Sequence, residues 1–503
     1  MAVRELERPS WLIRKDLKLY LDIYEVEKNF CYVGIYRDNV TKRIIYEVME
    51  PTLTDEESKL LERLKKFFID EVDDVALEPR KIGGEEIYKY VEEIFEKVTK
   101  KHGIELPKST KMKLLYYLRR DLAGYGKIHA LMKDPFIEDI SCNGPGIPVY
   151  VWHRIYESIE TNIKFDDSRE LDEFISRLVY LSGRHISLSQ PIVDAILPDN
   201  SRLLATLGGR VSDRGSNFTI RRTRADPFTV VDLVKLGTMS LFLAAYLWFV
   251  IDHYCSIMIA GAPAAGKTTT LNVLANFIPS HLKIVSLEET REIFLEHENW
   301  VPMVTSQDID LFELFKASLR QRPDYIIIGE IRGREAYAWM QALATGKLGM
   351  TTIHAESPAG VIHRLTSEPM NIPKVLIPSL NLIIVQRRIS REFEGMRMSV
   401  RRIVNVTEIT GMDPATERIL TNQVFDYDPY TDKIKYLGRS YLIGKIIREH
   451  GLREEDVRRE LDNRMLILKW LIEKGKRHIK EVANIVRAYY YDKEHVLSMV
   501  RGE

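Results

Sequence analysis

The sequence predicts an α/β protein whose second half contains a parallel sheet. Short apolar runs at 256–260, 283–287 and 324–328 each end at glycine or charged residues, as buried strands do. With 45% hydrophobic and 29% charged residues, the composition supports buried cores and excludes a fully disordered chain. At roughly 150 residues per domain, the 503 residues suggest about three domains.

Charge, cysteines and apolar runs limit the partners and the compartment. Lys+Arg and Asp+Glu are both 73, so with a net charge of +0 the chain as a whole shows no charge signal for nucleic acid or a membrane surface, which leaves room for a local basic patch. Cys31, Cys142 and Cys255 are too few for a disulfide framework, which favours a reducing compartment. Residues 1–18 carry no secretory signal pattern. The longest apolar run, 241–251, is shorter than the ~20 residues of a membrane span and predicts a buried helix.

Residues 1–104 are expected to form an accessory N-terminal domain. Two β-like runs, 31–36 and 44–48, surround a turn-forming Asp-Asn pair, which indicates a hairpin. Thr54 and Glu57 then form a capping-box pattern before the first of two amphipathic helical stripes. We expect these stripes to be core faces.

Residues 105–225 are expected to form an α+β domain. A basic helix is predicted at 108–122, and strand-like runs at 147–152 and 203–207 flank a helix near 171–182. A proline after Asp226 marks the start of a linker, because residues before proline avoid the helical region. The remaining parts are a linker at 226–237, the domain that carries the chemistry at 238–440, and a helical C-terminal extension at 441–503.

A complete phosphate-binding loop follows the first apolar strand of the second half. The pattern GxxxxGK[ST] stands between that strand and a helix, which is the context it requires. Its glycines let backbone N–H groups and the helix N-terminus face an anion. Lys267 is expected to reach the β- and γ-phosphates, and Thr268 to ligate Mg²⁺. The predicted nucleotide-binding residues are Gly261, Ala262, Pro263, Ala264, Ala265, Gly266, Lys267, Thr268 and Thr269.

Carboxylates follow the other two apolar strands. Glu288, Glu289 and Glu292 follow one strand, and Glu330 follows the other. Open α/β sheets bind ligands at the carboxyl ends of their strands. Glu330 is therefore expected to hold Mg²⁺ and its water shell, and one carboxylate of the first group is expected to orient the attacking water.

These motifs, in this order, resemble the secretion-superfamily ATPases, the hexameric motors of type II secretion, type IV pili and the archaellum. Residues 288–292 resemble their Asp box, the Glu330 strand their Walker B strand, and 351–355 their His box. The resemblance covers about residues 105–400 and is closest to the archaeal and tight-adherence pilus branches. It implies a RecA-like P-loop NTPase domain behind a PAS-like α+β N-terminal domain, assembled as a hexamer.

The resemblance also implies roles for single residues. Glu292 is expected to be the water-orienting base, supported by Glu288 and Glu289, and His354 is expected to sense the γ-phosphate or to bridge subunits. Lys347 stands where many members have a second histidine.

Arginines form a further group of candidates. Arg320 and Arg322 are expected either to act in trans on a neighbouring subunit's γ-phosphate or to form salt bridges inside the domain. The arginines expected to contact nucleotide from the N-terminal domain are Arg202, Arg221, Arg222 and Arg224.

The function that follows is an Mg²⁺-dependent ATPase. It would hydrolyse ATP to power assembly or export of pilin-like subunits through a polytopic membrane platform protein. We expect a cytoplasmic homo-hexamer at the inner face of the membrane. One alternative is a RecA-like nucleic-acid motor, although the zero net charge and the absence of an aromatic-basic run predict no nucleic-acid partner. Another is a low-turnover, ATP-gated assembly scaffold. The cargo stays open between archaellum, adhesive pilus and secretion.

Overall fold

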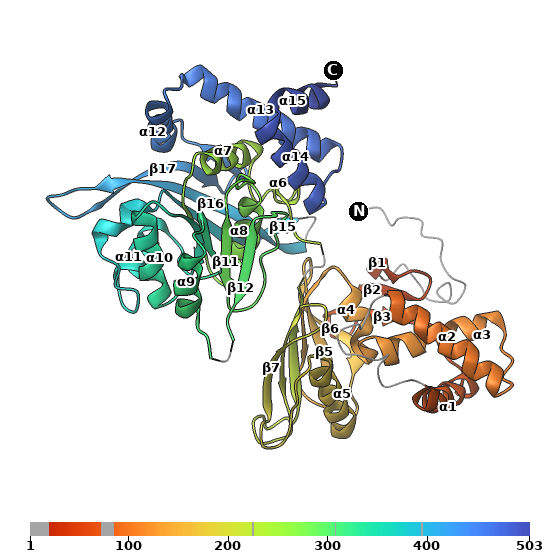
Figure 1. Ribbon diagram of the computed structural model, residues 1–503. Coiled ribbons are helices and arrows are strands. Elements are labelled where there is room, and N and C mark those ends of the chain that lie inside the picture. The colour runs from red at the N-terminus through yellow and green to blue at the C-terminus, as the bar shows by residue number, and fades with distance from the viewer. Residues whose placement is uncertain (1–19, 72–84, 224–225, 307, 394–395, 503) are drawn as a thin grey trace. The chain divides into compact units, whose positions relative to one another are not determined.

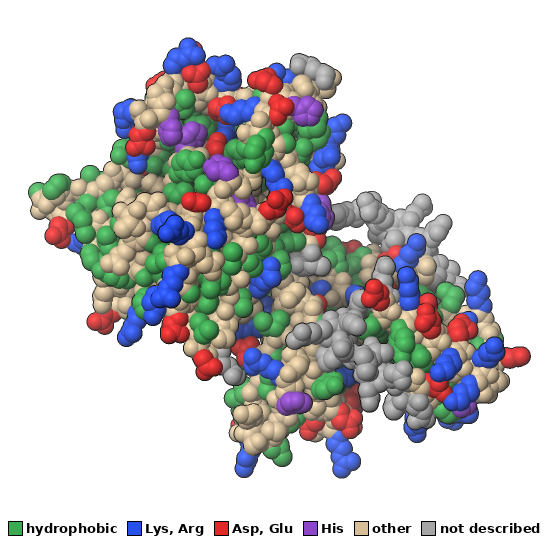
Figure 2. Space-filling model, viewed as in Figure 1, with side chains coloured by type: hydrophobic (Ala, Val, Ile, Leu, Met, Phe, Trp, Pro, Cys, Tyr) green, Lys and Arg blue, Asp and Glu red, His purple; other side chains and the backbone are tan. Residues whose placement is uncertain are grey.

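The computed structural model (Figure 1) describes residues 20–71, 85–223, 226–306, 308–393 and 396–502. The chain divides into two compact units, Met1–Ala225 and Asp226–Glu503. Among the described residues, no helix is both long enough and apolar enough to cross a bilayer. On the face drawn in Figure 2, basic and acidic side chains are interspersed, in keeping with the balanced composition.

The first unit is built on one nine-stranded sheet with the order β1-β2-β3-β6-β5-β4-β9-β8-β7. Neighbouring strands are antiparallel except β3 and β6, which are parallel. The strands are β1 Tyr20–Glu27, β2 Cys31–Arg37, β3 Ile44–Met49, β4 Ile137–Cys142, β5 Pro148–His153, β6 Glu157–Lys164, β7 Ile192–Ile196, β8 Arg202–Thr206 and β9 Asn217–Arg221. The predicted hairpin is confirmed as β2 and β3. Because β3 pairs with β6, the boundary drawn at residue 104 does not separate two packing units.

Helices of the first unit form an apolar cluster of their own and also cover the sheet. α1, α2 and α3 share one buried cluster, whereas α5 packs on the core of the sheet. The predicted capping box opens α1, since Glu57 N–H donates to Thr54 Oγ1 (3.1 Å) and Thr54 N–H to Glu57 Oε2 (3.0 Å). The helices are α1 Asp55–Glu71, α2 Glu85–Lys101, α3 Lys108–Leu118, a π-helical turn η3 Arg119–Ala123, a 3₁₀ turn η4 Gly126–Ile128, α4 His129–Lys133 and α5 Ser168–Leu181.

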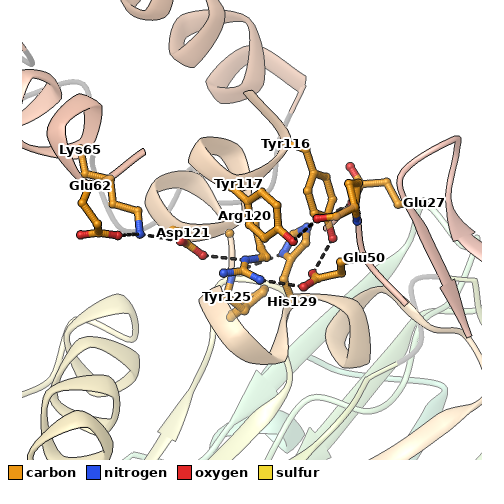
Figure 3. A network of polar contacts seen from close by, with 12 residues as sticks. Glu27, Glu50, Glu62, Lys65, Tyr116, Tyr117, Arg120, Asp121, Tyr125 and His129 are labelled. Atoms are coloured by element: carbon orange, nitrogen blue, oxygen red, sulfur yellow. Dashed lines mark hydrogen bonds and ion pairs between the residues drawn. The ribbon is translucent and has the colours of Figure 1, made fainter. Parts of the chain in front are cut away.

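A polar network joins these helices to the end of β3 (Figure 3). Arg120, in the π-helical turn, donates to Glu50 (2.8 Å) and to Asp121 (2.7 Å). Lys65 of α1 pairs with Asp121 at 2.9 Å, and the Tyr116 hydroxyl donates to Glu50 at 2.7 Å. The network satisfies charged groups that would otherwise be costly to remove from water.

The second unit has a nine-stranded sheet with the order β12-β11-β13-β14-β10-β15-β16-β17-β18. In this sheet order, neighbouring strands from β12 as far as β15 pair in parallel, and those from β15 to β18 pair antiparallel. The strands are β10 Ile257–Ala260, β11 Ile284–Glu288, β12 Trp300–Val304, β13 Tyr325–Ile328, β14 Leu348–Ile353, β15 Leu382–Phe393, β16 Met396–Met412, β17 Ile419–Asp428 and β18 Lys433–Tyr436. β14 lies between the strand before the phosphate loop and the strand before Glu330. This confirms the predicted RecA-like α/β fold.

Alternate residues of β10 face the two helical layers of this unit. Ile257 and Ile259 lie in the cluster with α7, α8 and the C-terminal helices, and Met258 and Ala260 in the cluster with α9, α10 and α11. The predicted buried helix is confirmed as α7, whose residues 243–251 are all buried. The helices are α6 Val230–Lys235, α7 Leu241–Asp252, α8 Lys267–Ala275, α9 Leu311–Arg320, α10 Arg334–Ala344, α11 Pro358–Thr366, the 3₁₀ turn η5 Lys374–Ser379, α12 Tyr441–His450, α13 Glu454–Glu473, α14 Ile479–Tyr491 and α15 Lys493–Arg501.

The C-terminal helices are part of the second unit's core. α13 packs along α7 (Figure 1), and its buried Arg464 pairs with Asp252 of α7 at 2.6 Å. The stretch assigned to the linker contains α6, whose Val230, Val231 and Leu233 are buried in the same core. The boundaries drawn at 237 and 440 therefore do not separate packing units.

Candidate active site

The loop between β10 and α8 has the backbone shape of a phosphate cradle. Gly266 caps α8 with φ 90°, and a Cβ there would lie 3.0 Å from Gln386 Nε2 and 3.1 Å from Arg401 Cδ. A Cβ on Gly261 would lie 2.3 Å from the backbone oxygen of Gln386. Only glycine fits at these two positions, and the resulting turn directs the N-terminal N–H groups of α8 toward an anion.

Lys267, His354 and Glu330 lie in contact at the carboxyl edge of the parallel strands. Lys267 Nζ donates to the backbone oxygen of Ala262 at 3.2 Å. It also lies 3.2 Å from His354 Nδ1. His354 Nε2 lies 2.9 Å from Glu330 Oε1. Burial, and then the charge of Lys267, lower the pKa of His354. A neutral imidazole has one donor and one acceptor nitrogen, which suits an ammonium on one side and a carboxylate on the other.

Glu330 is available to a further ligand despite the nearby histidine. Its Oε1 is buried and has no aligned hydrogen bond to any described residue, although His354 lies within ion-pair distance. Thr268, the second predicted metal ligand, is the second residue of α8, directly after Lys267. A hydroxyl and a carboxylate oxygen are the ligand types that Mg²⁺ accepts beside phosphate and water. The residues present therefore fit the expected ion.

Glu288, at the end of β11, is the buried carboxylate of the acidic group. Its Oε1 accepts hydrogen bonds from the backbone N–H groups of Glu292 (2.9 Å) and Ile293 (3.0 Å), whereas its Oε2 is buried and has no hydrogen-bond partner among the described residues. Burial raises the pKa of Glu288 to about 7, against the lowering effect of those two N–H groups. A Cβ on Gly329 would lie 3.4 Å from Glu288 Cγ, so this carboxylate stands beside the strand end that carries Glu330.

The other two glutamates of the group are exposed. Glu289 pairs with Arg332 at 2.5 Å. Glu292 contributes its backbone N–H to Glu288, but its side chain forms no hydrogen bond or ion pair with the described residues. The geometry therefore favours Glu288 over Glu292 as the group that orients water.

Arg320, Arg322 and Lys347 lie at the opposite edge of the sheet from the phosphate loop. Arg320 ends α9, Arg322 precedes β13, and Lys347 precedes β14, so all three stand at the amino ends of parallel strands. Arg320 and Arg322 are exposed and form no side-chain hydrogen bond or ion pair with the described residues. They are thus remote from their own subunit's phosphate loop, and the predicted salt bridges inside the domain are not seen.

The arginines predicted from the N-terminal domain fall into two kinds. Arg202 and Arg221 are exposed and directly opposite each other on β8 and β9, and Arg202 pairs with Asp194 at 2.6 Å. Arg222 is turned inward, where it donates to the backbone oxygens of Leu131 (3.3 Å) and Asp134. Arg224 lies outside the described residues. Arg222 is thus engaged within its own unit.

Sequence reasoning missed two residues that shape the loop, and a third that holds a neighbouring segment. Gln386 of β15 accepts a hydrogen bond from Thr270 (2.7 Å), and Arg401 of β16 donates to the backbone oxygen of Ala264 (3.2 Å). Asn272 of α8 holds the segment after the acidic group. No local motif marks Gln386 or Arg401, because strand pairing brings them to the loop from more than 100 residues away.

A glycine-rich loop at a helix N-terminus, an adjacent lysine and two carboxylates at neighbouring strand ends together define a P-loop nucleotide-binding protein with a RecA-like core. Comparison with known proteins gives the family. Residues 121–421 match the Type II/IV secretion system protein family, and the chain belongs to it.

Relatives are found in archaea and bacteria. The uncharacterized protein MJ0900 of Methanocaldococcus jannaschii is 34% identical, over 95% of this chain and 90% of that protein. The type IV secretion system protein VirB11 of Bartonella henselae is 26% identical, over 53% of this chain and 89% of that protein. Among solved structures, the Legionella pneumophila ATPase DotB is 17% identical with a TM-score of 0.41, covering 73% of this chain and 92% of that one.

Proposed function

We propose that the protein hydrolyses ATP to ADP and phosphate and couples this reaction to mechanical work in a secretion or pilus-type machine. The observation that carries the proposal is the buried carboxylate of Glu288 beside the strand end that carries Glu330; among the described residues, its Oε2 has no hydrogen-bond partner. An unsatisfied buried carboxylate oxygen is costly, and sites that tolerate such a cost are often functional.

The chain's residues divide the work as follows. The N–H groups of the loop and Lys267 bind the β- and γ-phosphates. Thr268 and Glu330 would hold Mg²⁺, which would supply positive charge to neutralise the transferred phosphoryl group. Glu288 orients the attacking water through Oε2, because Oε1 is already held by two backbone N–H groups.

His354 is proposed to report on the phosphates. Lys267 Nζ lies 3.2 Å from His354 Nδ1, and the same ammonium group is needed to bind the phosphates. Phosphate binding would therefore release His354 from Lys267 while Glu330 remains within reach of Nε2. Arg364 donates to the backbone oxygen of His354 (2.9 Å), so the change has a direct route to α11.

We further propose a homo-hexamer that docks on a polytopic platform protein at the inner face of the cytoplasmic membrane. Membership of the secretion family supports this assembly, and one relative is itself named a type IV secretion system protein. The exposed Arg320 and Arg322 support it as well, because they have no side-chain partner among the described residues. A neighbouring subunit's nucleotide would supply one.

The test is steady-state hydrolysis of ATP by the full chain with Mg²⁺, alone, with lipid vesicles and with DNA. We expect turnover that vesicles stimulate and DNA does not. Tight ATP binding with no turnover under any condition would favour the ATP-gated scaffold. Stimulation by DNA alone would favour the nucleic-acid motor. Each of these two results would overturn the proposal.

A further inference from the structure

The segment after the acidic group runs from the carboxyl edge of the sheet back to its amino edge without helix or strand structure. Between β11 and β12, residues 289–299 include a stretch, 291–297, to which no turn or regular element is assigned. Backbone N–H groups in such a stretch must find partners outside a ladder. Three consecutive ones, at Glu292, Ile293 and Phe294, do so on side chains.

Two of these three N–H groups hold the candidate catalytic carboxylate, and the third is held by the phosphate-loop helix. Glu292 and Ile293 donate to Glu288 Oε1, at 2.9 and 3.0 Å. Phe294 donates to Asn272 Oδ1 at 2.8 Å. Asn272 is 5% exposed and lies five residues after Lys267 on α8. One helix therefore anchors both the phosphate cradle and the backbone that orients Glu288.

Neighbouring contacts reinforce the same attachment. Asn276, at the end of α8, accepts a hydrogen bond from Glu296 N–H at 3.3 Å, and its amide donates to the backbone oxygen of Asn272 at 2.8 Å. Ile293 is fully buried in the core that α8 shares. Arg487 of α14 also holds this segment, because it donates to the backbone oxygen of Glu296 at 2.8 Å.

We propose that Asn272 is a positioning residue for hydrolysis: it fixes residues 292–294, and through them the Glu288 carboxylate, at a set distance from the bound phosphates. The inference rests on the proposed role of Glu288 in ATP hydrolysis. A side chain misplaced by about 1 Å can cost on the order of 100-fold in rate, so this attachment controls turnover without touching substrate. Nucleotide affinity depends instead on the loop and Lys267, whereas the Asn272 side chain accepts its hydrogen bond from Phe294.

The experiment compares two isosteric replacements in the full chain. Asn272→Leu removes the acceptor oxygen, and Asn272→Asp keeps it. We expect Asn272→Leu to lower kcat at least about tenfold with KM and ATP affinity within about twofold of wild type, and Asn272→Asp to restore kcat to within about threefold. Asn272→Ala gives a second variant without the acceptor in case leucine prevents folding. Asn299→Leu, an exposed change in the same connection, is the matched control and should leave kcat unchanged.

A second readout tests the attachment itself. Amide hydrogen exchange at 292–294 should speed up in Asn272→Leu and Asn272→Ala and stay slow in Asn272→Asp. Faster exchange with unchanged kcat would make Asn272 purely structural and overturn the inference. A fall in kcat without faster exchange, or an equal fall in ATP affinity, would overturn it too. The proposed function fails separately, if wild-type protein binds ATP and shows no turnover.

Discussion

Lys267 Nζ lies 3.2 Å from His354 Nδ1, so the lysine of the phosphate loop is already engaged by a second motif of the site. The two residues are 87 positions apart, and β14 delivers the histidine next to β10 because those strands are paired. A phosphate that takes Lys267 must therefore also change what His354 contacts.

The first prediction concerns this lysine. Lys267→Ala should abolish ATP hydrolysis and weaken ATP binding at least about tenfold, because an ammonium that bonds phosphate oxygens contributes on the order of 1.5–3 kcal/mol. Titration with a fluorescent ATP analogue, alongside a phosphate-release assay, measures both effects. Lys347→Ala, at the opposite edge of the sheet, is the control and should bind ATP as wild type does. Turnover near the wild-type rate in Lys267→Ala would contradict the assignment of the loop.

The second prediction separates two glutamates of the acidic group. Glu288→Gln should bind ATP and lose at least about 100-fold in kcat, because the amide cannot accept a proton from water. Glu292→Gln should lose less than about threefold, since its side chain is exposed and only its backbone N–H donates to Glu288. Single-turnover hydrolysis at saturating ATP measures both. The reverse ranking would return the role of base to Glu292, where the family resemblance placed it.

The third prediction is a pH dependence. Burial raises the pKa of Glu288 to about 7, and only its ionised form can act as a base. Activity should therefore be complete above this pKa and fall as the pH drops through about 7, down to about tenfold per pH unit in the acid limb. A kcat–pH profile in wild type and Glu292→Gln checks this, and the limb in Glu292→Gln should lie at lower pH, because the charge of Glu292 helps to raise the pKa of Glu288. A profile flat from pH 8 to pH 5.5 would exclude Glu288 as the titrating group.

Local patterns predicted the phosphate loop, the acidic strand ends, the capping box at Thr54 and the buried helix α7, because each depends on neighbours within a few residues. Glu288 could be placed at a strand end from sequence, but its burial could not. That burial depends on Gly329 and on the path of residues 292–294, which are fixed by strand pairing and by Asn272. The pairing of β3 with β6 could not be predicted from local patterns either, because it joins residues more than 100 positions apart.

The fourth prediction concerns the network of Figure 3. Arg120 is 15% exposed and donates hydrogen bonds to Glu50 and Asp121. Burial raises the pKa of Asp121, but the charges and hydrogen bonds of Arg120 and Lys65 outweigh burial, so the pKa of Asp121 is lowered. Arg120→Leu would leave these carboxylates without their main cation, which should destabilise the first unit by about 3 kcal/mol. Hydrogen exchange of amides in α1 and β3 measures the loss. Arg43→Leu, which breaks the exposed pair with Glu160, should cost less than about 1 kcal/mol.

The same network gives stability with a defined pH window. Because the pKa of Asp121 is lower in the folded state, its contribution is present above the unfolded pKa and is lost as the pH falls through the folded one. The protection factors of α1 amides, which correct for the slower intrinsic exchange at low pH, should therefore fall on acidification in wild type more than in Arg120→Leu. An equal fall in both would show that Arg120 does not set the ionisation of Asp121.

The last prediction is that Arg320 acts on a neighbouring subunit. It lies at the amino edge of the sheet, remote from its own phosphate loop, and has no side-chain partner among the described residues. A head-to-tail contact that repeats around a closed ring would bring this edge to the carboxyl edge of the next subunit, where the γ-phosphate lies. An arginine there stabilises the transition state, so Arg320→Ala should lower kcat by at least about 100-fold while ATP affinity stays unchanged.

An experiment with mixed subunits decides whether Arg320 acts in trans or in cis. Subunits carrying Arg320→Ala have intact loops and carboxylates, and subunits carrying Glu330→Gln have an intact arginine. Mixed rings should regain activity that neither parent has, because some interfaces join a wild-type Glu330 to a wild-type Arg320. Specific activity should also rise with protein concentration in wild type as rings form, with size measured by light scattering on the same samples. If mixed rings form but do not recover activity, Arg320 acts within its own subunit. If specific activity stays flat down to a demonstrated monomer, the active site is not shared between subunits.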